Sequence, residues 1–335
     1  MAETENLVAE IEALSAKLAE AKTSIATRII GQEDVVDLAL TAMLSGGHAL
    51  LMGLPGLGKT LLVDTLSTTM GLSANRVQFT PDLMPADILG SEVLETGEGG
   101  ARSFRFIEGP IFCQLLMADE INRASPRTQS ALLQAMQEKE VTIAGQHRPL
   151  PAPFHVLATQ NPIEQEGTYP LPEAQLDRFL LQIDVNYPDR ATERGILMAT
   201  TGTKDAAPYQ VFDGDTLLAA QTLVRRMPVG DAVVEAILDL VRSCRPGEAE
   251  ASAIVNDGVA WGPGPRAAQS LMLCARARAL LQGRLAPSVE DIAALARPVL
   301  THRMALTFAA RAEGKSLIGI IDGVTAQVTQ IEAAA

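Results

Sequence analysis

Residues 53–60, with the sequence GLPGLGKT, constrain this chain more than any other stretch. Gly53 and Gly58 enclose four residues and are followed by Lys59 and Thr60, with Gly56 between them. A polyphosphate is densely negative and must be wrapped closely by backbone N–H groups. Glycines allow the backbone angles and the close approach that side chains would block. Lys59 places a cation at the phosphates, and the Thr60 hydroxyl can take a Mg²⁺ coordination site.

The flanking sequence supports a phosphate-binding loop. Residues 48–52 form a short apolar run that predicts a buried strand leading into the loop. Residues 61–66 predict the helix that leaves it, with the positive end of its dipole toward the phosphates. The order strand, loop, helix favours a nucleotide-binding loop over a glycine-rich turn that only resembles one.

Two adjacent carboxylates, Asp119 and Glu120, end the next strongly apolar run, residues 113–118. Behind a phosphate loop, an acid at a strand end can hold Mg²⁺, usually through its water shell. A second acid can polarise a water molecule for attack on the γ-phosphate. Many strands end in acidic turns, so this pattern is weak alone. Its position about 60 residues after the loop favours the catalytic interpretation.

Another apolar strand, residues 154–159, ends at Asn161. An amide at that strand end could orient the attacking water, or it could cap a turn before Pro162. A last strand is predicted over residues 180–185. Strands that alternate with helices around a phosphate loop predict an α/β fold with a parallel sheet, here over residues 1–188.

Two segments interrupt this alternation, residues 81–109 and 141–153. Both suggest inserted loops or hairpins, which are usually surface features and often functional. In the first, Phe104, Phe106 and Ile107 alternate with Arg105, as expected for a hairpin with one apolar face. That face either packs on its own sheet or contacts a client protein.

Strand signals stop near residue 188, and helices are predicted at about 190–200, 214–226, 231–243, 264–282, 288–300 and 317–333. Residues 189–335 are therefore predicted to form a separate helical domain, with Arg266 at the start of one helix. A further amphipathic helix is predicted over residues 4–26, packed on its own domain rather than forming a coiled coil.

The composition narrows the partners and the compartment. A formal net charge of −13 argues against general affinity for nucleic acid or an anionic membrane. The three cysteines lack C-x-x-C spacing, and the four histidines share no metal-ligand spacing. We find no signal peptide and no apolar stretch long enough to span a bilayer, so we expect a cytoplasmic protein without membrane insertion.

The motifs together have the order of an AAA+ ATPase, and the chain resembles the MoxR family in particular. The resemblance rests on residues 119–124, 158–162, 171–179 and 302–303, and it extends over about residues 5–315. It implies a five-stranded parallel sheet of order 5-1-4-3-2, followed by an all-α lid. It also implies a homo-oligomeric ring, typically a hexamer, with ATP and Mg²⁺ at the subunit boundaries.

The resemblance assigns roles by position. Residues 53–61 would be Walker A, which comprises Gly53, Leu54, Pro55, Gly56, Leu57, Gly58, Lys59, Thr60 and Leu61. Asp119 and Glu120 would be Walker B, with Thr60 and Asp119 at the metal. Asn161 would be sensor 1, Arg178 the arginine finger, Arg266 sensor 2, and Ile30 and Gly31 would lie against the adenine. Arg123 and Arg127 lie near the same edge and remain alternatives for the finger.

The preferred functional hypothesis is an ATP-driven, chaperone-like remodeller. Family resemblance suggests that it helps mature a client complex or insert its cofactor or metal, together with a von Willebrand A domain protein on another chain. No Asp-x-Ser-x-Ser metal-adhesion motif occurs in this sequence. A nucleic-acid motor is the alternative, supported by Arg102 and Arg105 in the first insert. A nucleotide-controlled scaffold that hydrolyses little is a third hypothesis, which Glu120 opposes.

Overall fold

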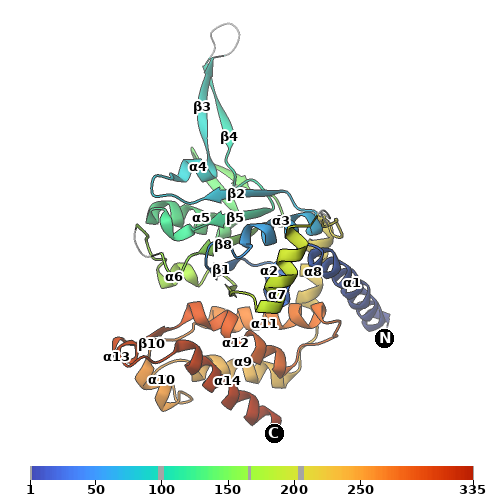
Figure 1. Ribbon diagram of the computed structural model, residues 1–335, viewed down its shortest axis with the longest axis vertical. Coiled ribbons are helices and arrows are strands. Elements are labelled where there is room, and N and C mark those ends of the chain that lie inside the picture. Colours follow the sequence, from blue (N-terminus) through green and yellow to red (C-terminus); the bar gives the residue numbers. More distant parts are fainter. Residues whose placement is uncertain (1, 97–101, 165–166, 203–206, 335) are drawn as a thin grey trace.

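A five-stranded parallel sheet forms the centre of the structure, a computed structural model that describes residues 2–96, 102–164, 167–202 and 207–334 (Figure 1). The strands lie in the order β2-β5-β8-β1-β9, and every neighbouring pair is parallel. Counted along the chain, this is the order 5-1-4-3-2, so the predicted fold class is confirmed. The bounds are Ala49–Gly53 (β1), Ala74–Gln78 (β2), Leu115–Asp119 (β5), His155–Gln160 (β8) and Leu181–Val185 (β9).

The sheet separates two apolar cores. Successive residues of a strand face opposite sides, and accordingly Leu50 enters one core while Leu51 enters the other. Because both faces are covered, the strands read as apolar runs. Ile11 and Leu18 are fully buried, so the first helix packs on its own chain. The covering helices are Ala2–Ala26 (α1), Glu33–Leu44 (α2), Lys59–Met70 (α3) and Pro126–Glu138 (α5), with a short α6 at Glu173–Leu176.

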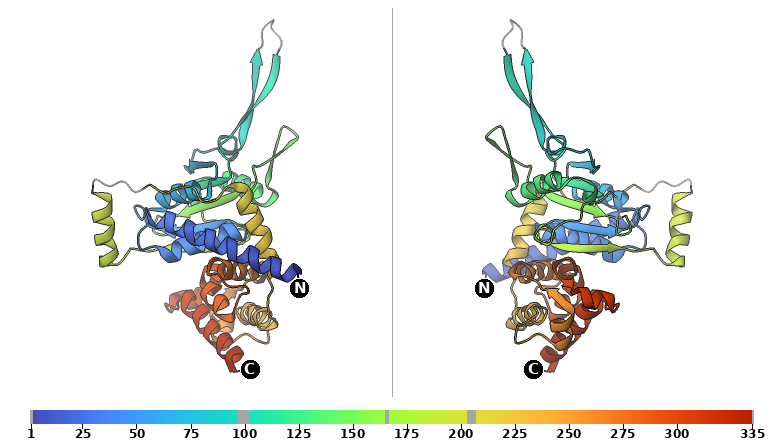
Figure 2. Two further views of the ribbon diagram at one scale, coloured as in Figure 1. Left: turned by 90° about the vertical axis from the view of Figure 1, so that its right-hand side faces the viewer. Right: turned by 90° about the vertical axis from the view of Figure 1, so that its left-hand side faces the viewer.

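Both predicted inserts form antiparallel hairpins. The first follows the short helix α4 (Pro85–Leu89) and pairs β3 (Gly90–Thr96) with β4 (Arg102–Glu108). It projects far from the sheet (Figure 1). The second pairs β6 (Glu140–Ile143) with β7 (Gln146–Pro149) and leaves the body beside the base of the first (Figure 2).

The chain after the sheet is largely helical. Its helices are Arg190–Thr200 (α7), Gly214–Arg226 (α8), Asp231–Ser243 (α9), Ala253–Gly258 (α10), Pro265–Leu281 (α11), Val289–Leu300 (α12), Phe308–Ala312 (α13) and Leu317–Ala334 (α14). A 3₁₀ turn, η2, spans Thr301–Arg303. The structure adds a small antiparallel ribbon that the sequence did not predict, β10 (Val259–Trp261) with β11 (Ala305–Leu306).

Helices α9 to α14 lie together below the sheet, whereas α7 and α8 lie beside it (Figure 1). Helix α8 packs against α1 and α2 beside the sheet and against α11 below it, so it contacts both the sheet domain and the helical domain. The division of the chain at residue 188 therefore stays a prediction. Among the helices described, none has the length and apolar character needed to cross a bilayer.

The cysteines and most histidines belong to the core. Cys113, Cys244 and Cys274 are free and buried, and burial raises the pKa of Cys244 and Cys274 to about 12. Burial also lowers the pKa of His48 and of His302 to about 3. Within the described residues, no three His, Cys, Asp or Glu side chains gather in a way that could hold a metal ion.

Candidate functional site

The loop at residues 53–60 joins β1 to α3 at the carboxyl end of the sheet. Gly56 and Gly58 have φ angles of +83° and +78°, where an L side chain is strained, although space is open around both. Gly53 differs, because a β-carbon there would lie 2.6 Å from the carbonyl oxygen of Val185 in β9. Two glycines therefore give the loop its shape, and the third allows β1 and β9 to pair closely.

Lys59 begins α3, and its side chain turns back over the loop. Its Nζ donates to the carbonyl oxygens of Gly53 at 2.5 Å and Leu54 at 3.1 Å. Burial lowers the pKa of Lys59, while Asp119 and Glu120 act in the opposite direction. Both carboxylates therefore lie within electrostatic reach of the ammonium group, although β8 separates β1 from β5 in the sheet.

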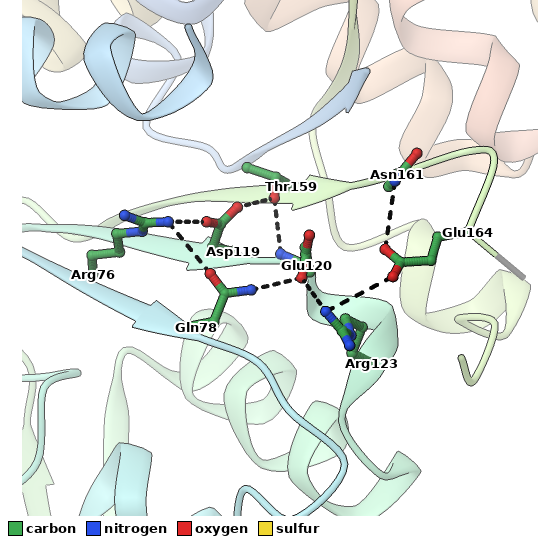
Figure 3. A network of polar contacts seen from close by, with 8 residues as sticks. All are labelled: Arg76, Gln78, Asp119, Glu120, Arg123, Thr159, Asn161 and Glu164. Carbon is green, nitrogen blue, oxygen red and sulfur yellow. Dashed lines mark hydrogen bonds and ion pairs between the residues drawn. The ribbon is translucent and has the colours of Figure 1, made fainter. Parts of the chain in front are cut away.

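Thr159 of β8 bridges Asp119 and Glu120 (Figure 3). Its hydroxyl donates to Oδ1 of Asp119 at 2.5 Å and accepts from the backbone N–H of Glu120 at 2.8 Å. The other carboxylate oxygen of Asp119 lies 2.5 Å from Nη2 of Arg76 in β2. One hydroxyl thus joins the carboxylate of Asp119 to the backbone of Glu120.

The side chain of Glu120 is held from the opposite side. Its Oε2 accepts from Nε2 of Gln78 at 2.7 Å and from Nη1 of Arg123 at 2.9 Å (Figure 3). The backbone of Glu120 has φ +55° and ψ +52°, a conformation uncommon for residues with a β-carbon. Backbone strain of this kind persists only where the surrounding structure maintains it, and it is concentrated at functional sites.

Arg123, an alternative for the trans finger, contacts Glu120 of its own chain and lies 3.8 Å from Glu164. Arg127 is exposed in the first turn of α5. Hydrogen bonding to Glu120 raises the pKa of Arg123. The contact with Glu120 gives Arg123 a role within the subunit that competes with reaching a neighbour.

Asn161 follows β8 at the edge of this network. Its Nδ2 donates to Glu164 at 3.5 Å (Figure 3). Its Oδ1 accepts from the N–H of Ile163 at 3.2 Å. This is the geometry of a turn cap, one of the two interpretations that the sequence left open. Glu164 also faces Arg123, so Asn161 connects to Glu120 through two side chains. A water-orienting role for Asn161 stays a prediction.

Ile30 and Gly31 lie beside helix α7. Gly31 has φ +68°, and a β-carbon there would lie 2.2 Å from the side chain of Thr192. Gln32, the next residue, donates from Nε2 to the carbonyl oxygen of Leu57 at 3.2 Å. The segment predicted to contact adenine is thereby joined to the phosphate loop, as that role requires.

Arg178 and Arg266 lie at the other end of the sheet. Both line a cavity of about 250 Å³, together with Lys139, Asp177 and residues 46–48, which precede β1. β1 has five residues, so at about 3.3 Å per residue this cavity lies roughly 16 Å from the phosphate loop. The structure does not bring either arginine to the phosphate loop of its own chain.

The structure also places functional candidates that the sequence did not single out: Gln32, Arg76, Gln78 and Thr159. Gln78 and Thr159 lie at or next to the carboxyl ends of β2 and β8, Arg76 lies within β2, and Gln32 precedes α2 and contacts the loop. A signal was present for Thr159, because the carboxyl ends of adjacent parallel strands meet at one edge. For Gln32, Arg76 and Gln78, the hydrogen-bond partner depends on how separate segments pack together.

Comparison with known proteins identifies two matching family descriptions. Residues 48–181 match the "ATPase family associated with various cellular activities (AAA)", and residues 251–322 match the "AAA lid domain". The first match contains the phosphate loop, the acid pair and Arg178. The second begins after α9 and contains Arg266 and Arg303.

The similarity extends over nearly the whole chain. "Chaperone MoxR1" of Mycobacterium tuberculosis is 41% identical over 309 residues, which are 92% of this chain and 80% of the relative. "Protein MoxR" of Paracoccus denitrificans is 30% identical and covers 93% and 96%. The crystal structure of a putative ATPase from Cytophaga hutchinsonii superimposes with a TM-score of 0.85 at 36% identity and covers 96% of both chains.

Proposed function

This chain belongs to the MoxR family of AAA+ ATPases, and we propose that it hydrolyses ATP to ADP and phosphate at a site shared by two subunits. We also propose that hydrolysis drives chaperone-like remodelling of a client protein. One observation carries the proposal. The phosphate loop and the acid pair meet at one end of the sheet, while the cavity lined by Arg178 and Arg266 lies at the other end of β1, roughly 16 Å along the strand.

Each subunit supplies the binding half of the site. Lys59 and the backbone N–H groups of the loop would bind the phosphates. Thr60 and Asp119 would hold Mg²⁺, which neutralises phosphate charge. The donor set fits this ion, since Mg²⁺ is usually held by one or two carboxylates and several waters. Glu120 would polarise the attacking water, with its carboxylate oriented by Gln78 and Arg123.

A neighbouring subunit would supply the cationic half. We propose that Arg178 and Arg266 face the phosphates of the next subunit in a ring, typically a hexamer. A cation supplied in this way stabilises the charge of the transition state and contributes about 10³–10⁵ in rate in GTPase systems. Hydrolysis would then depend on assembly, because no isolated subunit holds a complete site.

We propose that the partner is a von Willebrand A domain protein on a separate chain, and that the client receives a cofactor or metal during maturation. Cytoplasmic localisation also stays a prediction. The exposed β3–β4 hairpin is the surface that we assign to partner or client contact. The nucleic-acid alternative is weakened by the net charge of −13 and by the ion pair of Arg105 with Glu95 at 3.1 Å.

Two substitutions test the division of roles at the site. Lys59→Ala should lower ATP affinity at least about a hundredfold, because the phosphates lose a half-buried cation. Glu120→Gln should retain ATP affinity within about threefold and lower turnover at least about a hundredfold, because an amide cannot accept the proton. Binding of a fluorescent ATP analogue and phosphate release would separate the two effects. Equal loss of nucleotide affinity in both variants would contradict the assignment.

A further inference from the structure

Arg303 in η2 of the lid is 2% exposed, which makes it the largest fully buried side chain among the described residues. A guanidinium group has five N–H donors in a fixed planar arrangement. In Arg303 these donors reach six oxygen atoms: Oδ1 of Asp177 at 2.8 Å, the carbonyls of Phe179 (2.7 Å), Val299 (2.7 Å), Leu180 (3.0 Å) and Asp177 (3.4 Å), and the Ser270 hydroxyl at 3.1 Å.

Four of those oxygens belong to residues 177–180, the segment between α6 and β9. The adjacent lid residue, His302, adds a hydrogen bond from Nε2 to the carbonyl of Phe179 at 3.0 Å. On its other side, the segment is tied to the sheet domain, because the N–H of Leu180 donates to the carbonyl of His48 at 2.8 Å. The path of the segment is therefore fixed between the lid and the sheet.

This segment carries Arg178, and it also contacts Arg266. Arg178 lines the cavity of about 250 Å³ together with Lys139 and Arg266. Nη1 of Arg266 lies 3.6 Å from Oδ2 of Asp177, whose other oxygen binds Arg303. Arg303 thus fixes the backbone beside Arg178 and the carboxylate that faces Arg266.

Attachment of the lid to the sheet domain does not by itself explain why an arginine is buried at position 303. A buried guanidinium is costly to desolvate, and apolar side chains of similar volume often stabilise a fold as well or better. What apolar packing cannot supply is directional bonding to three backbone carbonyls of one short segment. We propose that Arg303 is a positioning residue for the inter-subunit site: it holds residues 177–180 so that Arg178 and Arg266 face the neighbour's nucleotide. The proposal rests on the proposed trans role of Arg178.

The test compares Arg303→Met, Arg303→Lys and a control, Arg297→Met, in the full-length oligomer. Methionine fills similar space without donors, and lysine keeps the charge but loses the planar set of donors. Arg297 is a lid arginine that forms an exposed ion pair with Asp322 and serves as the matched control. Amide hydrogen exchange over residues 177–180, phosphate release and binding of a fluorescent ATP analogue would be measured for each variant.

Arg303→Met should speed exchange of the amides at 178–180 at least about tenfold, because the segment opens locally more often. Its turnover should fall to within about threefold of that of Arg178→Ala, with ATP affinity unchanged within about threefold. The double variant Arg178→Ala/Arg303→Met should hydrolyse at the rate of Arg178→Ala alone, because both changes remove one function. Arg303→Lys should lie between Arg303→Met and wild type, and Arg297→Met should match wild type.

Unchanged exchange in Arg303→Met would overturn the proposal, as would a double variant slowed by the product of the two single effects. If Arg303→Met does not fold, as judged by circular dichroism, Arg303→Lys carries the same comparisons. Wild-type turnover in Arg178→Ala would overturn the trans role of that residue and the catalytic part of this proposal. The exchange measurement would still decide whether Arg303 holds the segment.

Discussion

At the scale of single residues, the hydroxyl of Thr159 is hydrogen-bonded on both sides, donating to the carboxylate of Asp119 and accepting from the backbone N–H of Glu120. Thr159→Val keeps the shape of the side chain and removes the hydroxyl. Oδ1 of Asp119 and the N–H of Glu120 then lose a partner, which should lower the free energy of unfolding by about 1–3 kcal/mol. The same change should lower turnover at least about tenfold, because the acid pair is no longer held in place.

Thr159→Ser restores the hydroxyl and is the matched control. Urea unfolding would measure stability, and phosphate release would measure turnover. We expect the serine variant to recover most of both quantities. A valine variant with wild-type turnover would show that the bridge between Asp119 and Glu120 is not needed for hydrolysis.

Residues whose roles follow from a local sequence pattern were predictable from the sequence. Residues whose roles depend on contacts between separate strands were not. Lys59 and Thr60 follow directly from the loop pattern, and Glu120 from the apolar run before it. Gln78 acts because β2 pairs with β5 in a register that sets it opposite Asp119. Strand register depends on packing of both strands and cannot be read from either one alone.

At the scale of elements, the β3–β4 hairpin resolves the question of its apolar face. Phe106 packs on its own chain, 5.7 Å from the ring of Phe112 and 3.9 Å beneath the guanidinium of Arg148. Phe104 is 70% exposed, and its cross-strand partner Leu94 is 51% exposed. The face is therefore divided into a packed base and an exposed outer part. Residues 97–101, between β3 and β4, lie outside the described residues.

The exposed pair gives a prediction about partner contact. Leu94→Ser/Phe104→Ser should leave the oligomer and the basal turnover unchanged within about twofold, because neither side chain contacts the nucleotide site. Stimulation of turnover by the proposed von Willebrand A domain partner should fall at least about fivefold, since buried aromatic anchors dominate interface energy. Arg105→Ala, one position along the hairpin, is the control. Full stimulation of the double variant would show that Leu94 and Phe104 are not needed for contact with the partner.

The principal helices and both inserts were predictable because their signals are local. Ser125 caps α5 by accepting from the N–H of Thr128 at 3.4 Å, and Ser288 precedes α12 as its N-cap in a capping box with Asp291. The ribbon of β10 and β11 was missed because strands of three and two residues are too short to show alternation. Its pairing joins segments more than 40 residues apart, which no local pattern indicates.

At the scale of the whole molecule, docking of the lid determines where Arg178 and Arg266 lie relative to the phosphate loop. Arg303 and His302 bind residues 177–180 at the amino ends of the strands, over more than 120 residues of chain. The sequence predicted Arg178 and Arg266 by resemblance, but their shared cavity depends on this long-range docking. Parallel strands place the phosphate loop at the opposite end. We therefore expect one subunit's loop to meet another subunit's arginines.

Mixing Arg178→Ala with Glu120→Gln tests whether the arginine of one subunit completes the site of its neighbour. Each variant alone should be nearly inactive, because every interface lacks one required group. In a randomly mixed ring of equal parts, about one quarter of the interfaces combine an intact Glu120 with an intact Arg178 from the neighbour. Turnover should therefore rise to about a quarter of the wild-type rate and be highest at equal proportions.

Phosphate release would be followed across mixing ratios, with subunit exchange demonstrated by energy transfer between labelled chains. If Arg178 acts in trans, turnover reaches a maximum near equal mixing. A rate that stays at the weighted sum of the two inactive variants at every ratio, despite proven exchange, would contradict the trans role of Arg178 and direct the search for the finger to Arg123 or Arg127.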